Sequence, residues 1–586
     1  MRLSTRKLLT LGLALSVGFA AACDDDADLV GPTPTPEPPA VPSGIAVSAT
    51  GPTSVQVSWT AVSGATGYVV ERAPGASGGS FAQVGTPSSA GFPDTGVSAE
   101  TTYRYRVAAT GSAGTSAFSG EAVVTTPEPP AEGPKEATIS ANITADRTLF
   151  ADTVYQLSGF VQVANGATLT IEAGTKIVAD FDIPGSSLFV LRGSRIIADG
   201  TADAPIVFTS ERPEGQRQPG DWGGLIIIGN GITNRGIPTF LEGTGTDDVV
   251  NPLQDYSGGT DNSDSSGILR YVRVEFAGFP TAPNEELNSI TMAAVGSGTT
   301  IEFVQTLLGL DDGFEWFGGA VDAKYLISYE TSDDHFDASE GFVGRLQYLI
   351  AFQSIRPEPR PNLAGGAASD PQGFENDGCW ASNCNAGNDN RGASEPFTTP
   401  VFANFTLVGA PPGAWETPSG NIGMQIRRGM GGLYVNGVVV RYSRAGLSFR
   451  GQETMNRMDA GILAFNSIYF SGVNDVFLPG DPENASLPSR QFTADMAANN
   501  LEAGEVAPLD LFASIPSDTR DATGADFDWR PAAGSPIATG GLEDFSVLPQ
   551  ALQDVAAGAV MGTSYRGAAD PNGPAWWDGW TNYRRF

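Results

Sequence analysis

Histidine, cysteine and positive charge are all scarce in this sequence, and each shortage excludes a class of site. Three cysteines among 586 residues exclude a four-cysteine zinc site, and a single histidine leaves His335 as the sole candidate base for a Ser-His-Asp or Cys-His arrangement. Lys and Arg number 33 against 66 Asp and Glu. The net charge of −33 argues against a nucleic-acid partner, because binding phosphates needs a surplus of cations.

Residues typical of long surface helices are also scarce, whereas residues typical of turns are abundant. Charged residues make up 17% of the chain, which contains 73 glycines and 41 prolines. Short strand-like runs such as LIIIG and YVRVEF recur, which predicts an all-β protein. Since 586 residues exceed one ordinary domain, we expect two or three structural units.

Residues 1–22 have the features of an export signal. A positively charged start precedes an apolar run too short for a stable membrane anchor, and small residues lead up to Cys23. This order resembles a bacterial lipoprotein signal, in which Cys23 becomes the lipidated first residue; an ordinary cleaved signal is the alternative. Residues 23–43 are rich in proline, which is typical of an extended tether. We expect an exported protein that a lipid anchor alone holds at the outer membrane or cell surface of a bacterium.

A small β-sandwich is predicted over residues 44–126. Its runs alternate apolar and polar residues, and its turns are rich in Gly and Ser. Through Trp59, Tyr68 and the run YRYRVAA at 103–109, this stretch resembles a fibronectin type III domain. The resemblance implies a spacer or adhesion module without chemistry of its own. Residues 127–135 form a second Pro-rich linker.

Strand-like runs follow one another at short spacing through residues 136–586, with no helices between them. This periodicity, with Gly, Asn and Asp at the turns, predicts a parallel β-helix, in which each coil stacks its short strands on the next. The C-terminal end is expected to cap the solenoid. Its aromatic residues are Trp576, Trp577, Trp580 and Tyr583.

Two successive coils carry the same acidic motif. DDGFE at 311–315 and DDHFD at 333–337 are 22 residues apart, and a similar strand-like run precedes each. A coil of that length would place one motif above the other, about 4.8 Å away. The sequence therefore predicts a two-rung ladder of carboxylates, made up of Asp311, Asp312, Glu315, Asp333, Asp334 and Asp337.

Stacked carboxylates repel one another unless something offsets their charge. They can splay into solvent and cap turns, some can keep a proton through a raised pKa, or a cation can lie between them. Calcium is the natural cation, because it takes several oxygen ligands. Three hypotheses are therefore open: turn-capping acids, a calcium site formed by these six residues, and catalytic acids.

The catalytic hypothesis makes the chain a polysaccharide-degrading enzyme. β-Helices often carry lyases and inverting glycosidases, and an inverting pair needs carboxyl groups about 6.5–9.5 Å apart. Asp312 with Asp334 or Asp337 is the candidate pair, and Lys324 is the candidate base of a lyase. The Gly-His-Gly and Arg-Ile-Lys motifs of polygalacturonases are missing from the sequence.

His335 lies inside the second acidic motif, but its counterpart in the first is Gly313. Since the acids repeat and the histidine does not, we interpret His335 as a local turn or surface residue rather than a catalytic group. Cys379 and Cys384 are expected to form a short-loop disulfide, as exported chains favour.

Two further segments are interpreted as loops. DYSGGTDNSDSSG contains Asp255, Asp261 and Asp264, but it lacks the spacing of an EF-hand and is predicted to be a solvated loop. Residues 355–400 contain no clear strand, and loops of that length are usually functional or disordered.

Several longer strings are specific to one family. LTIEAGTKIVAD, GDWGGLIIIGNG, GGTDNSDSSGILRYVRVEFAG and the ending GWTNY, together with the acidic motifs, resemble exported bacterial β-helix lipoproteins often found beside TonB-dependent outer-membrane receptors. The resemblance covers residues 136–583 and implies a right-handed, pectin lyase-like β-helix at a cell surface. It leaves the chemistry open. We expect a binding or scaffold role towards a glycan or an outer-membrane receptor protein, with calcium as a stabilising ion; the alternative is a lyase or inverting glycosidase.

Overall fold

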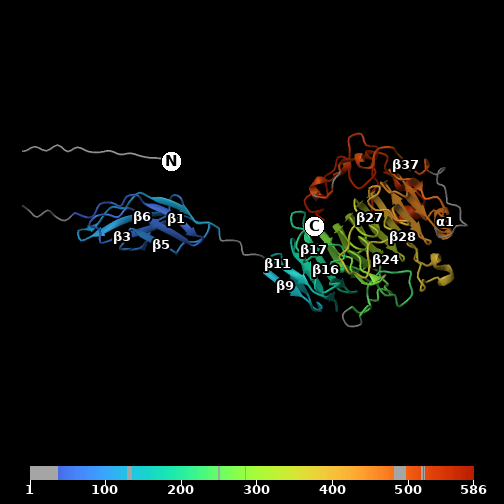
Figure 1. Cartoon of the computed structure of the whole chain (residues 1–586), viewed down its shortest axis with the longest axis horizontal. Coiled ribbons are helices and arrows are strands. Elements are labelled where there is room, and N and C mark those ends of the chain that lie inside the picture. Colours follow the sequence, from blue (N-terminus) through green and yellow to red (C-terminus); the bar gives the residue numbers. More distant parts are fainter. Residues whose placement is uncertain are drawn as a thin grey trace, which may run out of the picture. The chain divides into compact units, whose positions relative to one another are not determined.

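The structure is a computed structural model, which describes residues 37–128, 135–247, 251–283, 285–480, 496–516, 519–520 and 522–585. The chain divides into two compact units, Met1–Gly133 and Pro134–Phe586 (Figure 1). The export signal and Cys23 lie outside the described residues, as does most of the predicted tether. None of the helices in the described part of the chain has the length and apolar character needed to cross a bilayer.

The first unit is a sandwich of two antiparallel sheets, ordered β1-β2-β5 and β4-β3-β6-β7, with β8 beside β6. Its strands are Ala46–Gly51 (β1), Ser54–Ser58 (β2), Gly67–Pro74 (β3), Ala82–Gly85 (β4), Gly91–Asp94 (β5), Thr102–Gly111 (β6), Gly114–Thr115 (β7) and Ala122–Thr125 (β8). Trp59 and Tyr68 pack edge to face in its core, with ring centroids 5.0 Å apart. The Tyr103 hydroxyl accepts a hydrogen bond from the amide of Ser98. This strand order and the corner tyrosine make the unit a fibronectin type III-like sandwich.

The second unit is a right-handed parallel β-helix, and one of its two long sheets has ten strands. These are Phe160–Val163 (β12), Ser187–Val190 (β15), Gly224–Ile228 (β18), Ile290–Ala293 (β22), Phe314–Phe317 (β24), Phe336–Ser339 (β26), Gln372–Asp377 (β28), Ile422–Arg427 (β30), Ala445–Phe449 (β33) and Asp475–Phe477 (β36). All neighbouring strands in this sheet pair in parallel, so equivalent residues of successive coils stack in columns.

The other long sheet has 17 strands. They are Lys135–Ile139 (β9), Arg147–Leu149 (β10), Thr153–Leu157 (β11), Thr168–Ile171 (β13), Lys176–Ala179 (β14), Arg195–Asp199 (β16), Ile206–Ser210 (β17), Gly267–Glu275 (β19), Thr300–Leu307 (β23), Ala323–Tyr329 (β25), Arg345–Phe352 (β27), Val401–Val408 (β29), Gly432–Val435 (β31), Val438–Val440 (β32), Leu463–Asn466 (β34), Tyr469–Ser471 (β35) and Glu502–Ala503 (β37). Short elements outside the two sheets are Pro280–Ala282 (β20), Glu285–Glu286 (β21), Phe512–Ser514 (β38), Asp528–Pro531 (β39), Gln452–Asp459 (α1) and Gln550–Ala556 (α2).

Aromatic residues bend four strands of the large sheet at one corner of the coil. Tyr271, Phe303, Tyr325 and Tyr348 all have positive φ, a conformation that costs a residue with a side chain roughly 1–2 kcal/mol. Their rings stack along the solenoid with centroids 4.4–4.9 Å apart. The stacking offsets the backbone strain and turns each strand through the same corner. Sequence periodicity shows the coil, but it does not identify the residue that turns it.

The C-terminal segment (residues 508–516, 519–520 and 522–585) lies along the flank of the β-helix, so the prediction that it caps the solenoid is wrong. Trp580 packs edge to face on Tyr271 and Phe303, which belong to strands in the middle of the large sheet. Asn404 and Asn436 continue the positive-φ column and hydrogen-bond the C-terminal segment. The aromatic residues of this segment therefore cover an apolar sheet face instead of an open solenoid end.

Candidate cation site

The two acidic motifs stack as their spacing predicts. Strand β24 pairs with β26 in the register that places Glu315 beside Asp337, and Phe314 beside Phe336 inside the coil. The two phenyl rings are 5.4 Å apart, at an interplanar angle of 14°. The repeated Phe thus anchors each rung in the core, and the acid that follows it faces outward.

A second column of polar side chains runs beside this ladder and joins successive coils. The Asp312 amide donates to Asn288 Oδ1 over 3.2 Å, and the Asp334 amide donates to Asp312 Oδ1 over 2.9 Å. The Gln372 amide in turn donates to Asp334 Oδ1, and the Ile422 amide donates to Gln372 Oε1 over 2.9 Å. One carboxylate oxygen of Asp312 and one of Asp334 therefore bond the next coil's backbone, as the turn-capping hypothesis requires.

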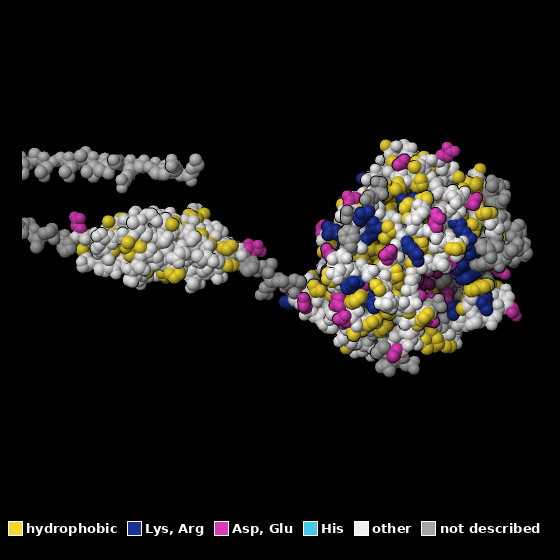
Figure 2. Space-filling view, viewed as in Figure 1, with side chains coloured by type: hydrophobic (Ala, Val, Ile, Leu, Met, Phe, Trp, Pro, Cys, Tyr) yellow, Lys and Arg dark blue, Asp and Glu magenta, His cyan; other side chains and the backbone are white. Residues whose placement is uncertain are grey.

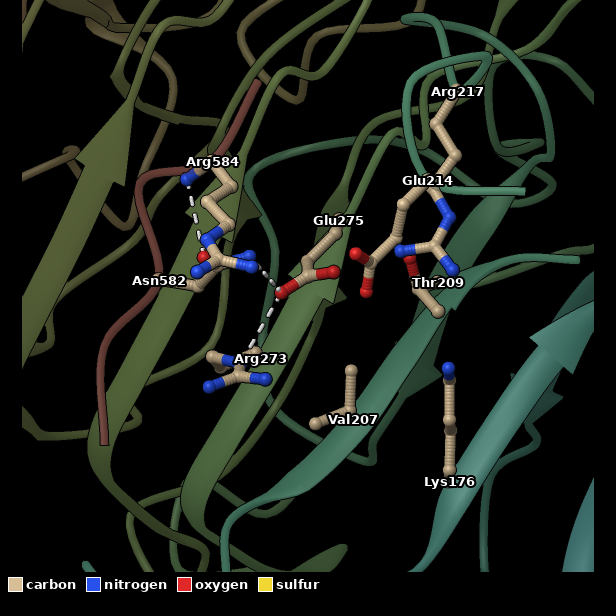
Figure 3. Close-up of a pocket in the computed structure, with 9 residues that line it drawn as sticks. All are labelled: Lys176, Val207, Thr209, Glu214, Arg217, Arg273, Glu275, Asn582 and Arg584. Atoms are coloured by element: carbon tan, nitrogen blue, oxygen red, sulfur yellow. Dashed lines mark hydrogen bonds and ion pairs between the residues drawn. The ribbon is translucent and has the colours of Figure 1, made fainter. Parts of the chain in front are cut away.

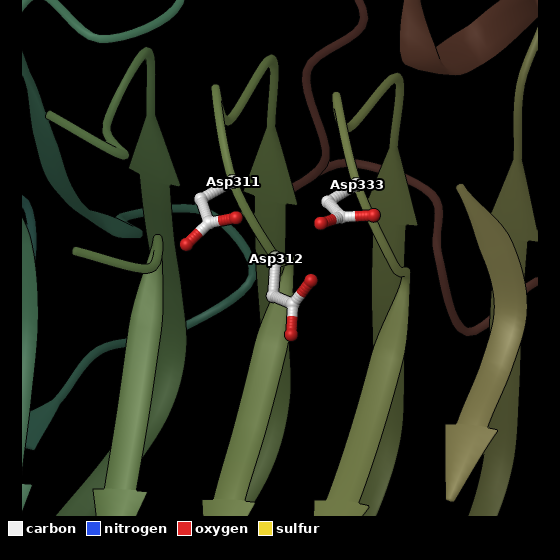
Figure 4. Close-up of side chains that lie close together, drawn as sticks. All are labelled: Asp311, Asp312 and Asp333. Atoms are coloured by element: carbon white, nitrogen blue, oxygen red, sulfur yellow. The ribbon is translucent and has the colours of Figure 1, made fainter. Parts of the chain in front are cut away.

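The acids of both columns line a cleft of about 160 Å³ on the ten-stranded sheet. Nine of its ten lining residues are acidic and the tenth is an amide: Glu242, Asn288, Asp311, Asp312, Glu315, Asp333, Asp334, Asp337, Asp370 and Glu375. Figure 4 shows Asp311 and Asp333 at equivalent points of adjacent coils, with Asp312 beside them. In Figure 2, acidic side chains gather in a hollow that Lys and Arg side chains flank.

Two groups of three carboxylates in this cleft have the spacing of a cation site. One oxygen each of Asp311, Asp312 and Asp333 lie within 4.8 Å of one another, as do those of Asp312, Glu315 and Asp337. Calcium–oxygen distances are about 2.3–2.6 Å, so oxygens on opposite sides of one ion are about 5 Å apart. Both groups therefore fit calcium, and Asp312 belongs to both.

Burial and mutual repulsion raise the pKa of the carboxyl groups in the cleft. Burial, and after it repulsion from a neighbouring acid, raises the pKa of Asp311, Asp312 and Glu315 well above the ordinary value. The same causes raise the pKa of Asp333 to about 8, with Asp370 as the acid that contributes most, and that of Glu242 to about 7, with Glu286 as the acid that contributes most. In the absence of a cation, burial and repulsion thus favour the protonated form of these groups, and a bound divalent ion would displace the protons.

Two arginine side chains form ion pairs with acids at one end of the cleft. Arg427 forms ion pairs with Glu375 and Asp377, and Arg428 pairs with Asp377. In the described residues, no ion pair reaches Asp311, Asp312 or any other member of the two three-carboxylate groups. Among the acids that line the cleft, Asp337 Oδ1 is buried with no hydrogen-bond partner. The protein's own cations thus leave the two groups unneutralised.

Several residues of the cleft do not belong to either of the two acidic motifs. Strand β28 lies within the segment in which the sequence shows no clear strand, and its register places Glu375 beside Asp337. The repeated Phe-acid pair, which recurs as Phe374-Glu375, is a signal that would have found this third rung. The sequence offers no comparable signal for Glu242, Asn288 and Asp370, because they reach the cleft from loops and turns.

His335 is a buried residue, so the interpretation as a surface residue is wrong. Its side chain is 3% exposed and its Nδ1 lies 2.8 Å from Ser328 Oγ, away from the acidic cleft. Burial lowers its pKa to about 3, which keeps the ring neutral. Lys324 lies on β25 in the large sheet, beside Glu302 and Gln347 of the neighbouring strands, and is not among the cleft residues.

The remaining sequence predictions concern local structure. Cys379 and Cys384 are joined by a disulfide. Asp261 accepts bonds from the amide and hydroxyl of Ser263, and Asp264 accepts from the amide of Asn230. Asp255 likewise bonds Ser257, so all three acids stabilise turns.

The matched family model is described as a pectate-lyase like beta helix domain, and it covers residues 141–509. The chain belongs to this family. The match includes every acid of the cleft and excludes the sandwich and most of the C-terminal segment. No curated protein matches the chain.

Matches to solved structures cover about the length of the sandwich. A Fn3-like protein from Clostridium thermocellum is 32% identical over 15% of this chain and 95% of that one, with a TM-score of 0.14. The FN5 domain of Drosophila Lar is 25% identical over 15% and 98%, with a TM-score of 0.14. Titin domains A168–A170 are 27% identical, with a TM-score of 0.15, and the match spans 15% of this chain and about a third of that fragment.

The raised pKa values predict how pH affects the cation-free protein. A carboxyl group whose folded pKa exceeds its unfolded value stabilises the fold when protonated, and this contribution is lost as pH rises. For Asp333 the loss extends from about pH 4 to about pH 8; Asp370, Glu242 and Glu286 face this group and raise its pKa, while Arg427 lowers it. We expect the thermal midpoint in EDTA to fall over this interval, and to fall less in Asp333→Asn. Equal pH profiles for both proteins would contradict the prediction.

Proposed function

We propose that the acidic cleft binds calcium and that the bound ion attaches the β-helix to a carbohydrate. The observation that carries this proposal is the pair of three-carboxylate groups that share Asp312. A bound calcium ion would neutralise the cleft and offer its remaining coordination positions to sugar hydroxyl or carboxylate oxygens. The pectate-lyase-like fold supports a carbohydrate-related role for the domain.

An exposed aromatic residue next to the cleft supports the choice of a sugar ligand. Trp380 is 55% exposed, and the Arg428 guanidinium that pairs with Asp377 lies 5.0 Å from the centre of its ring. Aromatic rings beside polar groups suit sugars, which have both apolar faces and hydroxyl edges. We further propose that Cys23 is lipidated and that the sandwich is a spacer between the membrane and the β-helix. An outer-membrane receptor protein is the alternative partner.

Binding of immobilised glycans with and without calcium tests this function. Wild-type protein is expected to retain a glycan in millimolar calcium and to release it in EDTA, and Asp312→Asn is expected to fail in both conditions. Asp203→Asn, which changes an exposed acid outside the cleft, is the matched control and should behave as wild type. Glycan retention that is unchanged by EDTA and also unchanged in Asp312→Asn would refute the proposal.

A polysaccharide-degrading activity is the second candidate, because the cleft combines several carboxyl groups of raised pKa. Oxygens of Asp312 and Asp337 lie within 4.8 Å of each other, which is closer than the spacing that an inverting glycosidase uses. A calcium-dependent lyase is the better form of this candidate. Release of oligosaccharides with an unsaturated non-reducing end by wild type, lost in Asp334→Asn, would establish it.

A further inference from the structure

Two other cavities of the β-helix differ in what their walls offer a ligand. The larger, of about 260 Å³, lies beside the C-terminal segment, and Figure 3 shows its Glu275 carboxylate paired with Arg273. Its four basic side chains are matched by Glu214 and Glu275 in the same cavity and by Glu136 and Glu211 in the groove beside it. The larger cavity therefore has no excess charge that would select a ligand.

The smaller cavity shares Asp333 with the acidic cleft. Its walls come from three successive coils and from the loop between β29 and β30. The cavity leaves about 10 Å³ for the centre of a water-sized sphere. By this measure one water molecule needs at least about 10–15 Å³, so the occupant is no larger than a water molecule.

Five polar side chains that line the smaller cavity are buried, and each has an atom without a hydrogen-bond partner. None of the five residues is more than 7% exposed. Buried polar groups in native proteins are almost always paired with protein or with ordered water, so several unpaired atoms around one cavity indicate a bound partner. The five atoms are Gln353 Oε1, Gln372 Nε2, Trp415 Nε1, Asn421 Nδ2 and Tyr442 Oη.

Both glutamine side chains are held at their other ends. Gln372 Oε1 accepts a hydrogen bond from the Ile422 amide over 2.9 Å, and Gln353 Nε2 donates to the Ile355 carbonyl over 2.6 Å. These bonds settle which end of each side-chain amide is free. Gln372 therefore offers the cavity a donor, and Gln353 offers it an acceptor.

The other walls of the smaller cavity are fixed as well. The Asn421 amide donates to the Pro371 carbonyl over 2.8 Å, which ties the loop between β29 and β30 to the preceding coil. The Tyr442 hydroxyl lies so close to Gly373 that a Cβ atom there would be 2.5 Å from it. Since the walls are held in place, the partners of the five atoms have to come from an occupant.

The unpaired atoms decide which occupant fits. Gln372, Trp415 and Asn421 present N–H donors. Gln353 presents an acceptor, and the Tyr442 hydroxyl can act as either. A halide ion would leave the Gln353 oxygen unsatisfied, and a metal ion would face N–H groups, which cannot coordinate it. Water both donates and accepts, and its size matches the cavity.

We propose that one buried water molecule occupies this cavity, where it donates to Gln353 Oε1 and accepts hydrogen bonds from the surrounding N–H groups. Gln372 connects this water to the polar column of the acidic cleft, because its backbone amide donates to Asp334 Oδ1. The water thereby supports the residue that holds Asp334. The inference does not depend on calcium: its failure would leave the calcium site intact, and the reverse also holds.

A high-resolution crystal structure of the full chain, from crystals grown in sodium bromide, identifies the occupant. The expected result is density for one oxygen atom about 2.7–3.2 Å from Gln353 Oε1 and from at least two of the N–H groups, without an anomalous signal at the bromine absorption edge. An anomalous peak in the cavity would show an anion site. A cavity without density would be dry, and either result would refute the inference.

A substitution at Tyr442 tests the same inference in solution. With water bound, Tyr442→Phe removes one of its partners, and the thermal midpoint is expected to fall by about 2 °C. In a dry cavity the substitution would only remove an unpaired buried hydroxyl, and the midpoint would rise. An unchanged or higher midpoint would therefore contradict the bound water. Tyr271→Phe, at a tyrosine outside the cavity, is the matched control and should leave the midpoint unchanged.

Discussion

Calcium at millimolar concentration is expected to raise the thermal midpoint of the β-helix by about 5 °C, and EDTA is expected to reverse the gain. A ligand at 100 times its dissociation constant stabilises the native state by about 2.7 kcal/mol, and in a large domain each kcal/mol corresponds to about 2 °C. The physical reason is that a calcium ion would balance the charge of Asp311, Asp312 and Asp333, with which no cation of the described residues forms an ion pair. Differential scanning calorimetry at pH 7.5 measures the shift.

Substitution of Asp312 isolates this effect. Asp312→Asn removes one charge from both three-carboxylate groups and keeps an oxygen that can accept the Asp334 amide. In EDTA the variant should be at least as stable as wild type, because a buried amide needs neither a proton nor a cation to be uncharged. In calcium it should lose most of the shift. A variant that keeps the full calcium shift would place the ion elsewhere, and wild-type protein without a shift would rule out a calcium site in the cleft.

Replacing Trp580 with alanine is expected to destabilise the protein by about 3–5 kcal/mol, the usual cost of removing a buried tryptophan. Trp580 is fully buried, packs on Tyr271 and Phe303, and donates its indole N–H to the Trp576 carbonyl over 2.8 Å. Its own carbonyl accepts a bond from Arg273 over 3.0 Å. The substitution therefore loosens the attachment of the C-terminal segment to β19 and β23.

Hydrogen exchange shows where the stability is lost. In Trp580→Ala, faster exchange is expected in the C-terminal segment and in β19 and β23, because these strands lie beneath the indole ring. Trp380→Ala is the matched control: this residue is 55% exposed, and its loss should cost little stability. Faster exchange confined to the last coil, around β36, would contradict the lateral packing of the segment and favour a cap.

The ladder was predictable because it depends on a repeat. In a parallel β-helix whose coils have a fixed length, residues that are one coil length apart in the sequence lie side by side. The 22-residue offset was therefore enough to predict that Glu315 stacks on Asp337. The same rule failed for Glu375, because the longer connection between β26 and β28 breaks the offset although the strands still pair in register. A search for a phenylalanine followed by an acid, at any spacing along the chain, would have identified Glu375.

The sequence by itself determined the all-β character, the two units, the parallel coils and the repeated acids, since each follows from local composition or a fixed period. Only the tertiary structure decided which loops deliver Glu242, Asn288 and Asp370 to the cleft. It also decided that His335 is buried and that the C-terminal segment covers a flank of the β-helix. These features depend on contacts between distant segments, such as the hydrogen bond that Arg273 donates to the Trp580 carbonyl across 307 residues of sequence. Side-chain packing in three dimensions sets such contacts, and no period in the sequence encodes them.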